Sequence, residues 1–190
     1  MNWRQPVILL DTDLDENHGE DRQITHYLYG GDTTYRLKQE AVLGIGGMLM
    51  LQALGFTVRQ YHMNEGHTAL LTIERLRQNG FNEDTVRQKC TFTTHTPIPA
   101  GHDYFDYNLA TKTLGSFLPD NIRDYATYDR LGMTQLAMNL SSKTNSVSVR
   151  HNEVCQSMFP GYQIENVTNG VYHPRWVGAH MKALLDEYFP

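Results

Sequence analysis

Three short segments of this chain are apolar or β-branched, and each ends in a turn of polar residues. Residues 56–61 lead into His62-Met-Asn-Glu-Gly-His67, and the same arrangement recurs at Thr93-Thr-His-Thr96 and at Val167-Thr-Asn-Gly170. Segments with helical periodicity lie between them. Alternating strands and helices favour a parallel sheet flanked by helices, and such sheets bind ligands at the carboxyl ends of their strands. The sequence therefore predicts an α/β fold with polar turns at one sheet edge.

The boundaries of the elements follow from apolar runs and from residues that begin or end helices. A long helix is predicted with Asp32 or Thr33 as its cap, residues 36–54 as its body and Gly55 closing its C-terminus. The segment 97–128 is the least regular, because prolines interrupt it. We further expect strands at 7–10, 57–63, 90–94 and 164–167, an extended segment at 146–149, and helices at 20–29, 68–78, 82–89, 134–140, 152–158 and 175–188.

Composition narrows the class of protein. The net charge is −5 without a basic stripe, which argues against nucleic acid or an anionic membrane as a partner. No apolar run approaches membrane-spanning length, and the N-terminus lacks the pattern of a secretory signal. Cys90 and Cys155 lie outside any Cys-x-x-Cys spacing and are typical of buried, reduced thiols. Together these features predict a cytoplasmic protein.

Gly44-Ile-Gly-Gly47 is the most glycine-rich segment of the chain. It lies inside the predicted long helix and does not follow a strand, so it fails the context test for a dinucleotide-binding loop. Each glycine in a helix interior costs about 1 kcal/mol relative to alanine. We therefore expect a steric reason for them, namely close packing of this helix against a neighbouring element.

His62, Glu65 and His67 have side chains that bind metals, but their spacing is not that of a zinc protease. The two histidines are separated by five positions rather than four, and Gly66 interrupts the segment. A turn could still bring the three side chains together, with His95 or His102 as a further ligand. The alternative is that Asn64 or Glu65 caps the following helix.

Three further features have both a functional and a structural interpretation. Pro97 disfavours helical geometry for the residue before it, which places His95 on a rigid, extended turn. By itself His95 would be a structural histidine, and Asn169-Gly170 would be only a turn. Arg36 and Glu40 are spaced as an i, i+4 ion pair on a solvated helix face, which would contribute a few tenths of a kcal/mol.

Taken together, the ordered motifs resemble those of the α-glucan (glycogen or maltodextrin) phosphorylases, and most closely the short prokaryotic branch. The segments that carry the resemblance are Leu10-Asp-Thr-Asp13, Leu28-Tyr-Gly-Gly-Asp32, Arg36-Leu-Lys-Gln-Glu40, His62-Met-Asn-Glu-Gly-His67, Thr93-Thr-His-Thr-Pro-Ile-Pro-Ala-Gly-His-Asp103 and Thr168-Asn-Gly-Val171. The resemblance implies a two-domain glycosyltransferase of the B-type fold. Residues 1–190 would be the C-terminal half of its N-terminal Rossmann-like domain, reaching the interdomain crossover.

The resemblance also implies a reaction and a set of site residues. The family, which includes allosteric enzymes of carbohydrate metabolism, cleaves α-1,4-glucan with orthophosphate to give glucose 1-phosphate. His95 would be the catalytic residue at the glucosyl subsite, where its main-chain carbonyl stabilises developing positive charge. Asn169 would bind a glucosyl hydroxyl, and Glu65 and His67 would border the acceptor subsites. Pyridoxal phosphate is the family cofactor, but its lysine and the phosphate-binding residues have no counterpart in this sequence.

The chain alone is therefore expected to be inactive, as a fragment that supplies part of a sugar-binding cleft. Its expected partners are α-1,4-glucan or maltodextrin, orthophosphate in the complete enzyme, and either a complementing chain or further copies of itself; neither nucleic acid nor a membrane is expected. Two alternatives remain open from the sequence. One is a non-catalytic glucan-binding module that uses Glu65, His67, His95 and Asn169, and the other is a metal-dependent hydrolase that uses His62, Glu65, His67 and His95.

Overall fold

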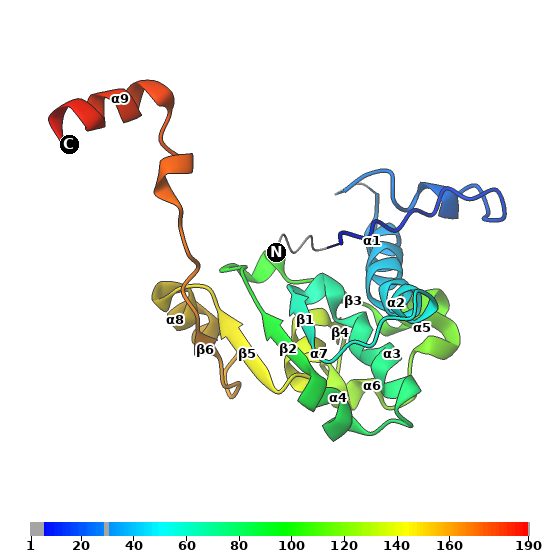
Figure 1. Cartoon of the computed structure of the whole chain (residues 1–190). Helices are drawn as coiled ribbons and strands as arrows, with labels where there is room; N and C mark the ends of the chain where they lie inside the picture. The colour runs from blue at the N-terminus through cyan, green and yellow to red at the C-terminus, as the bar shows by residue number, and fades with distance from the viewer. Residues whose placement is uncertain (1–5, 29–30, 190) are drawn as a thin grey trace.

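The computed structural model describes residues 6–28 and 31–189. Within them, a four-stranded parallel sheet lies at the centre, with strand order β1-β2-β5-β6. Figure 1 shows the sheet with helices packed around it. The strands are β1 (Tyr61–Asn64), β2 (Cys90–Thr93), β5 (Lys143–Ser146) and β6 (Glu165–Asn166). The predicted α/β class with a parallel sheet and flanking helices is confirmed.

The predicted long helix exists, but it is built in three pieces: α1 (Thr33–Ala41), a π-helical turn (Val42–Gly46) and α2 (Gly47–Ala53). Asp32 caps it, since its side chain accepts a hydrogen bond of 2.9 Å from the amide of Tyr35. Gly55 follows the helix with a φ of +74°, a left-handed conformation that favours glycine. Both predicted boundaries are therefore confirmed.

Gly44 has the steric reason that the sequence predicted. A Cβ atom at this position would lie 2.7 Å from the backbone nitrogen of Leu71, so the π-helical turn can approach helix α3 (Leu70–Gln78) only without a side chain there. Gly47 is different, because a Cβ at this position would meet nothing within 4 Å. Close packing thus explains the glycine at position 44 but not the glycine at position 47.

The remaining elements complete the layers around the sheet. A two-stranded antiparallel ribbon beside the main sheet pairs β3 (Tyr104–Phe105) with β4 (Leu131–Gly132). β3 lies in the irregular segment 97–128, in which the sequence predicted no element, and β4 follows shortly after that segment. The bounds are α3 (Leu70–Gln78), α4 (Glu83–Lys89), β3 (Tyr104–Phe105), α5 (Tyr107–Leu114), α6 (Ile122–Tyr125), β4 (Leu131–Gly132), α7 (Met133–Asn139), α8 (Val149–Met158) and α9 (Ala179–Tyr188), with short 3-10 turns at Asp21–Gln23, Gly66–Thr68, Pro99–Gly101, Gly115–Phe117 and His173–Arg175.

One hydrophobic core runs beneath the sheet and between the helices. Its largest fully buried side chains include Met63 on β1, Phe92 on β2, Leu76 on α3 and Leu136 on α7. Cys90 and Cys155 are both buried free thiols, as the sequence predicted. Burial of each large apolar side chain contributes about 1.5–3 kcal/mol to the stability of the fold, and therefore of the sheet whose strands carry these side chains.

Two sequence predictions for the N-terminal region are wrong. Residues 7–10 do not form a strand, and Val7 and Leu9 are 83% and 87% exposed. An apolar run becomes a strand only where a neighbouring strand can accept its backbone hydrogen bonds, and none pairs with it among the described residues. The helix expected over 20–29 is reduced to the 3-10 turn at Asp21–Gln23, and Tyr29 and Gly30 lie outside the described residues.

Helix α9 stands away from the body of the molecule at the end of an extended segment (Figure 1). Its large apolar side chains are exposed, among them Met181, Leu184 and Leu185. The predicted helix over 175–188 is confirmed from Ala179 onward. None of the helices in the described ranges is both long enough and apolar enough to cross a membrane.

Candidate functional site

The three polar turns that the sequence singled out lie at one edge of the parallel sheet. Glu65 directly follows β1, Thr94 directly follows β2, and Val167 directly follows β6. After β6 the chain continues beside β5, because Val167 and Asn169 donate backbone hydrogen bonds of 3.0 and 3.1 Å to the carbonyls of Ser146 and Val147. Parallel strands present their carboxyl ends at the same edge, so the sequence interpretation of a shared edge is correct.

A chain of polar side chains crosses β1, β2 and β5 near this edge. His62 Nε2 lies 2.7 Å from Thr93 Oγ1, and Thr93 Oγ1 donates a hydrogen bond of 2.8 Å to Asn145 Oδ1. Since the Thr93 hydroxyl donates to Asn145, its oxygen is available to accept from His62, which places the imidazole proton on Nε2. His62 is thereby part of a structural network that ties the three strands together.

Glu65 organises the turn after β2. Its own backbone has a φ of +67°, which is rare for a residue with a side chain. Its carboxylate accepts a hydrogen bond from the backbone amide of His95 and another, of 3.0 Å, from the hydroxyl of Thr96. Thr94 Oγ1 lies 3.5 Å from the same carboxylate. Glu65 does not cap the following helix with its side chain, so the capping alternative is wrong.

His95 is held by its main chain while its side chain is exposed. The turn is fixed on one side by the Glu65 carboxylate and on the other by a backbone hydrogen bond of 3.0 Å from Thr94 to the carbonyl of Asn145. The hydroxyl and methyl of Thr94 are fully buried. The turn that carries His95 is therefore restrained on both sides, and its imidazole is exposed.

Asn169 also has an exposed side chain at this edge. It follows β6, which is separated from β2 by one strand, β5. Adjacent strands lie about 4.8 Å apart, so the turns that carry His95 and Asn169 are separated by roughly 10 Å. The structure thus places both predicted residues on the same edge, with the end of β5 between them.

His67 lies on the 3-10 turn after Glu65 and is partly buried. Burial, and after it repulsion from Arg36, lowers the pKa of His67 below its ordinary value of 6.5, although Glu65 and Asp103 act in the opposite direction. A histidine with a lowered pKa is neutral at pH 7. Its ring can then both donate and accept a hydrogen bond, which suits recognition of a hydroxyl group.

Arg36 connects helix α1 to the segment that follows the His95 turn. Its Nε lies 3.0 Å from Glu40 Oε1, and its Nη2 donates a hydrogen bond of 2.9 Å to Asp103 Oδ2. The predicted i, i+4 pair is present, but the predicted solvated face is wrong, since Glu40 is only 1% exposed. The sequence could not indicate this, because the residues that bury Glu40 are distant along the chain.

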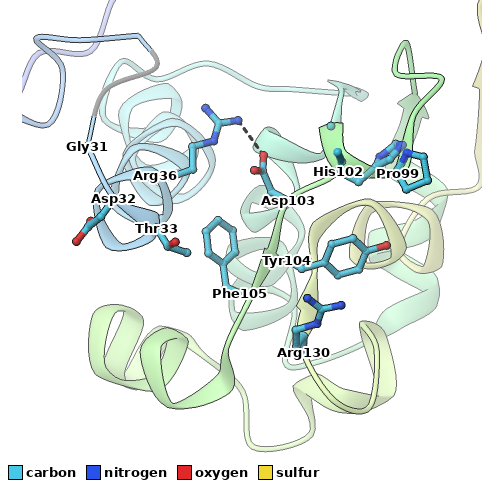
Figure 2. A pocket seen from close by; sticks show the side chains of 12 residues that line it. Gly31, Asp32, Thr33, Arg36, Pro99, His102, Asp103, Tyr104, Phe105 and Arg130 are labelled. Carbon is cyan, nitrogen blue, oxygen red and sulfur yellow. Dashed lines mark hydrogen bonds and ion pairs between the residues drawn. The ribbon is translucent and has the colours of Figure 1, made fainter.

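A hollow of about 920 Å³ opens beside Arg36 and Asp103. Figure 2 shows Arg36 extending from α1 towards Asp103, with Tyr104 and Arg130 on the side of the ribbon β3–β4. The guanidinium of Arg130 stacks over the Tyr104 ring at 4.9 Å from its centroid. The sequence did not indicate that Tyr104 and Arg130 line this hollow, because nothing in their local pattern distinguishes them from ordinary surface residues.

No three His, Cys, Asp or Glu side chains in the described ranges are grouped so that they could hold a metal ion. The proposed ligands are engaged elsewhere: His62 with Thr93, and Glu65 with the turn of His95. His102, the further candidate, is buried with its Nδ1 2.9 Å from the hydroxyl of Thr134. The structure does not bring these side chains together around one point.

The chain is similar to three phosphorylases over nearly its whole length. It is 37% identical to the maltodextrin phosphorylase of Thermococcus litoralis over 206 residues, which cover 97% of this chain and 25% of the relative. It is 35% identical to a glycogen phosphorylase of Mycobacterium tuberculosis (91% of this chain, 24% of the relative) and 30% identical to one of Aquifex aeolicus (96% and 30%). The chain thus spans about a quarter of the length of these curated relatives. No protein-family model matches it.

Proposed function

Because this chain belongs to the α-glucan phosphorylase family, we propose that it supplies part of the glucosyl and acceptor subsites for phosphorolysis of α-1,4-glucan. The observation that carries the proposal is the turn at His95, whose backbone is fixed by Glu65 while its imidazole stays exposed at the carboxyl edge of the sheet. Recognition of a sugar ring requires contact groups that are carried on a rigid backbone.

We propose that His95 acts through both its side chain and its main chain. Cleavage of a glycosidic bond develops positive charge on the sugar ring, and a fixed carbonyl dipole stabilises that charge without reorganising during the reaction. The two restraints on this turn, from Glu65 and from Asn145, supply the necessary rigidity. The His95 ring, which faces solvent, would bind a hydroxyl of the same glucosyl unit.

Asn169 and His67 would complete the recognition of the sugar. An amide offers donors and an acceptor to a ring hydroxyl, and a neutral imidazole offers one of each. For Glu65 we propose a supporting role: its carboxylate holds the turn of His95, and therefore acts on the glucan through that turn. Glu65 would still border the acceptor subsites, as the family resemblance implies.

The cofactor of the family does not fit the residues of this chain. Pyridoxal phosphate requires a lysine amine for its Schiff base. Lys38 and Lys182 form ion pairs with Asp21 and Asp186. The other lysines, Lys89, Lys112 and Lys143, are exposed, and none follows a strand of the parallel sheet at its carboxyl end. We therefore propose that residues 1–190 correspond to the C-terminal half of an N-terminal domain.

The same observation on lysines favours one second candidate, a glucan-binding module without catalytic activity. Such a module would use His67, His95 and Asn169 as described, but it would not release glucose 1-phosphate under any condition. The two candidates share their first test, which is binding of the sugar, and differ in whether a complementing polypeptide restores turnover.

Binding of maltoheptaose tests the shared part of the proposal. In a titration followed by NMR of the histidine rings, we expect the signals of His95 and His67 to shift while that of His180, on α9, stays unchanged. The variants H95A and N169A should each weaken binding by roughly 2- to 10-fold, the effect of losing one hydrogen bond of about 0.5–1.5 kcal/mol. H180A is the matched control, since His180 is also exposed. Equal affinities for all three variants would refute the assignment.

A further inference from the structure

Glu40 is a buried carboxyl group for which the proposed function gives no role. It lies on α1 and is only 1% exposed. Neither of its oxygens accepts a hydrogen bond of good geometry from any residue in the ranges 6–28 and 31–189. An ionised carboxylate in such a place loses its hydration without full compensation, and a buried group in this position commonly takes up a proton instead.

A second carboxyl group shares the same guanidinium. Arg36 lies 3.0 Å from Glu40 Oε1 and 2.9 Å from Asp103 Oδ2, so the two acids approach one cation from different elements. Asp103 is about one-third exposed at its side chain, whereas Glu40 is sealed from water. Two carboxyl groups close to one another repel each other when both are ionised, and this repulsion favours a proton on one of them. The proton favours the member that is more buried.

We propose that Glu40 is a positioning residue whose carboxyl stays protonated at neutral pH and which, with Asp103, fixes Arg36 between helix α1 and the segment after the His95 turn. Asp103 is then the ionised carboxylate of this pair beside Arg36. This arrangement clamps the chain at Asp103, eight residues beyond His95, against the helix. It also places the Arg36 charge near His67, where it helps to keep that imidazole neutral.

The electrostatic surroundings of Glu40 agree with this geometry. Burial, and after it the neighbouring Asp103, raises the pKa of Glu40 to about 9, while Arg36 opposes the shift. The charged and titratable groups around it are Arg36 from α1, Asp103 from the segment after the 3-10 turn Pro99–Gly101, and His67, which faces Arg36 and Asp103 from the turn after β1.

The dependence of stability on pH tests the proposal. The folded chain holds a proton on Glu40 that the unfolded chain, with an ordinary carboxyl pKa of about 4.3, has released. The contribution of Glu40 to the free energy of unfolding is therefore fully present below the unfolded pKa. It is lost as the pH rises towards the folded pKa. Between pH 7.0 and 8.0 this group alone should raise the equilibrium constant for unfolding about tenfold per pH unit, which corresponds to about 1.36 kcal/mol per unit.

The other shifted groups act alike in the wild type and the variants. His67 and His102 have pKa values lowered from 6.5 by burial and titrate below this window. The thiols of Cys90 and Cys155 have pKa values of about 11 in the folded chain and about 8.5 in the unfolded chain, so they add to the slope equally in every variant. In urea titrations at low protein concentration, E40Q should remove the Glu40 contribution, so that its equilibrium constant rises about tenfold less per pH unit than that of the wild type. E74Q is the matched control: Glu74 is as buried as Glu40, but it accepts hydrogen bonds of 2.9 Å from Arg77 and Gln78. E74Q should retain the wild-type slope.

Infrared spectroscopy gives a second readout that does not require reversible unfolding. The wild-type chain at pH 7 should show the carbonyl stretch of one protonated carboxyl group, which E40Q and E40A should both lack and E74Q should keep. A wild-type chain with no such band, or with a pH slope equal to that of E40Q, would overturn the proposal. Neither experiment involves a sugar. The protonation of Glu40 can therefore be refuted while the proposed glucan site holds, and the glucan site can be refuted while Glu40 is protonated.

Discussion

The packing of Gly44 against α3 gives a prediction whose sign depends on geometry alone. Gly44 and Gly47 lie three positions apart in one continuous helical segment, and replacing either with alanine changes helix propensity in the same direction. The two sites differ in what the new methyl group would meet. At position 44 it would lie 2.7 Å from the backbone nitrogen of Leu71, and at position 47 nothing lies within 4 Å.

The magnitudes follow from these two distances. Alanine is favoured over glycine in a helix by about 1 kcal/mol, so G47A should stabilise the fold by about that amount. G44A gains the same term, but a methyl group forced against backbone atoms cannot be relieved by a side-chain rotation, and overpacking costs up to about 3 kcal/mol. The net result for G44A is a destabilisation of about 2 kcal/mol, and the two variants should differ by roughly 3 kcal/mol.

Thermal and urea unfolding of the two variants and the parent chain measure this difference. For a chain of this size, 1 kcal/mol corresponds to about 2–4 °C in Tm. G47A should therefore melt a few degrees above the parent and G44A several degrees below it. If both variants shifted stability in the same direction by similar amounts, the inference that the helix approaches α3 through Gly44 would be wrong.

Three further predictions concern the core and the site. E65A should increase hydrogen exchange of the His95 amide at least about tenfold in an NMR measurement, because a hydrogen bond to a charged group contributes about 1.5–3 kcal/mol; unchanged exchange would exclude Glu65 as the restraint. Cys90 and Cys155, buried and with pKa values of about 11, should resist alkylation at pH 8 until urea is added, and rapid labelling of the native chain would contradict their burial. F92A should lower the free energy of unfolding by about 3–5 kcal/mol in urea titrations, and a loss below about 1 kcal/mol would place Phe92 outside the core.

Local signals in the sequence were sufficient for much of the fold. Asp32 and Gly55 mark the two ends of the long helix because a capping side chain and a left-handed glycine act within a few residues of themselves. Asn82 caps α4 in the same way, through a hydrogen bond of 2.9 Å from the amide of Thr85. The polar turns after the strands were also placed correctly, since a parallel sheet collects them at one edge.

Properties that depend on distant residues could not be predicted in this way. The strand expected at residues 7–10 needs a partner strand, which an apolar pattern cannot supply. Glu40 has the sequence pattern of an exposed ion pair, and only the packing of the surrounding elements makes it buried. The role of Glu65 depends on the turn of His95, thirty residues later, so the side chain that reads as a cap or a ligand is instead a support for another loop.

Phosphorolysis tests the central claim, that this chain provides part of a glucan phosphorylase site. Maltoheptaose, orthophosphate and pyridoxal phosphate would be supplied to the chain alone and to the chain mixed with a polypeptide corresponding to the rest of the Thermococcus litoralis relative, and glucose 1-phosphate would be measured. We expect release of glucose 1-phosphate only in the mixture, with H95A and N169A lowering the rate and H180A leaving it unchanged. Glucose 1-phosphate from the chain alone, or a mixture whose activity is indifferent to His95 and Asn169, would contradict it.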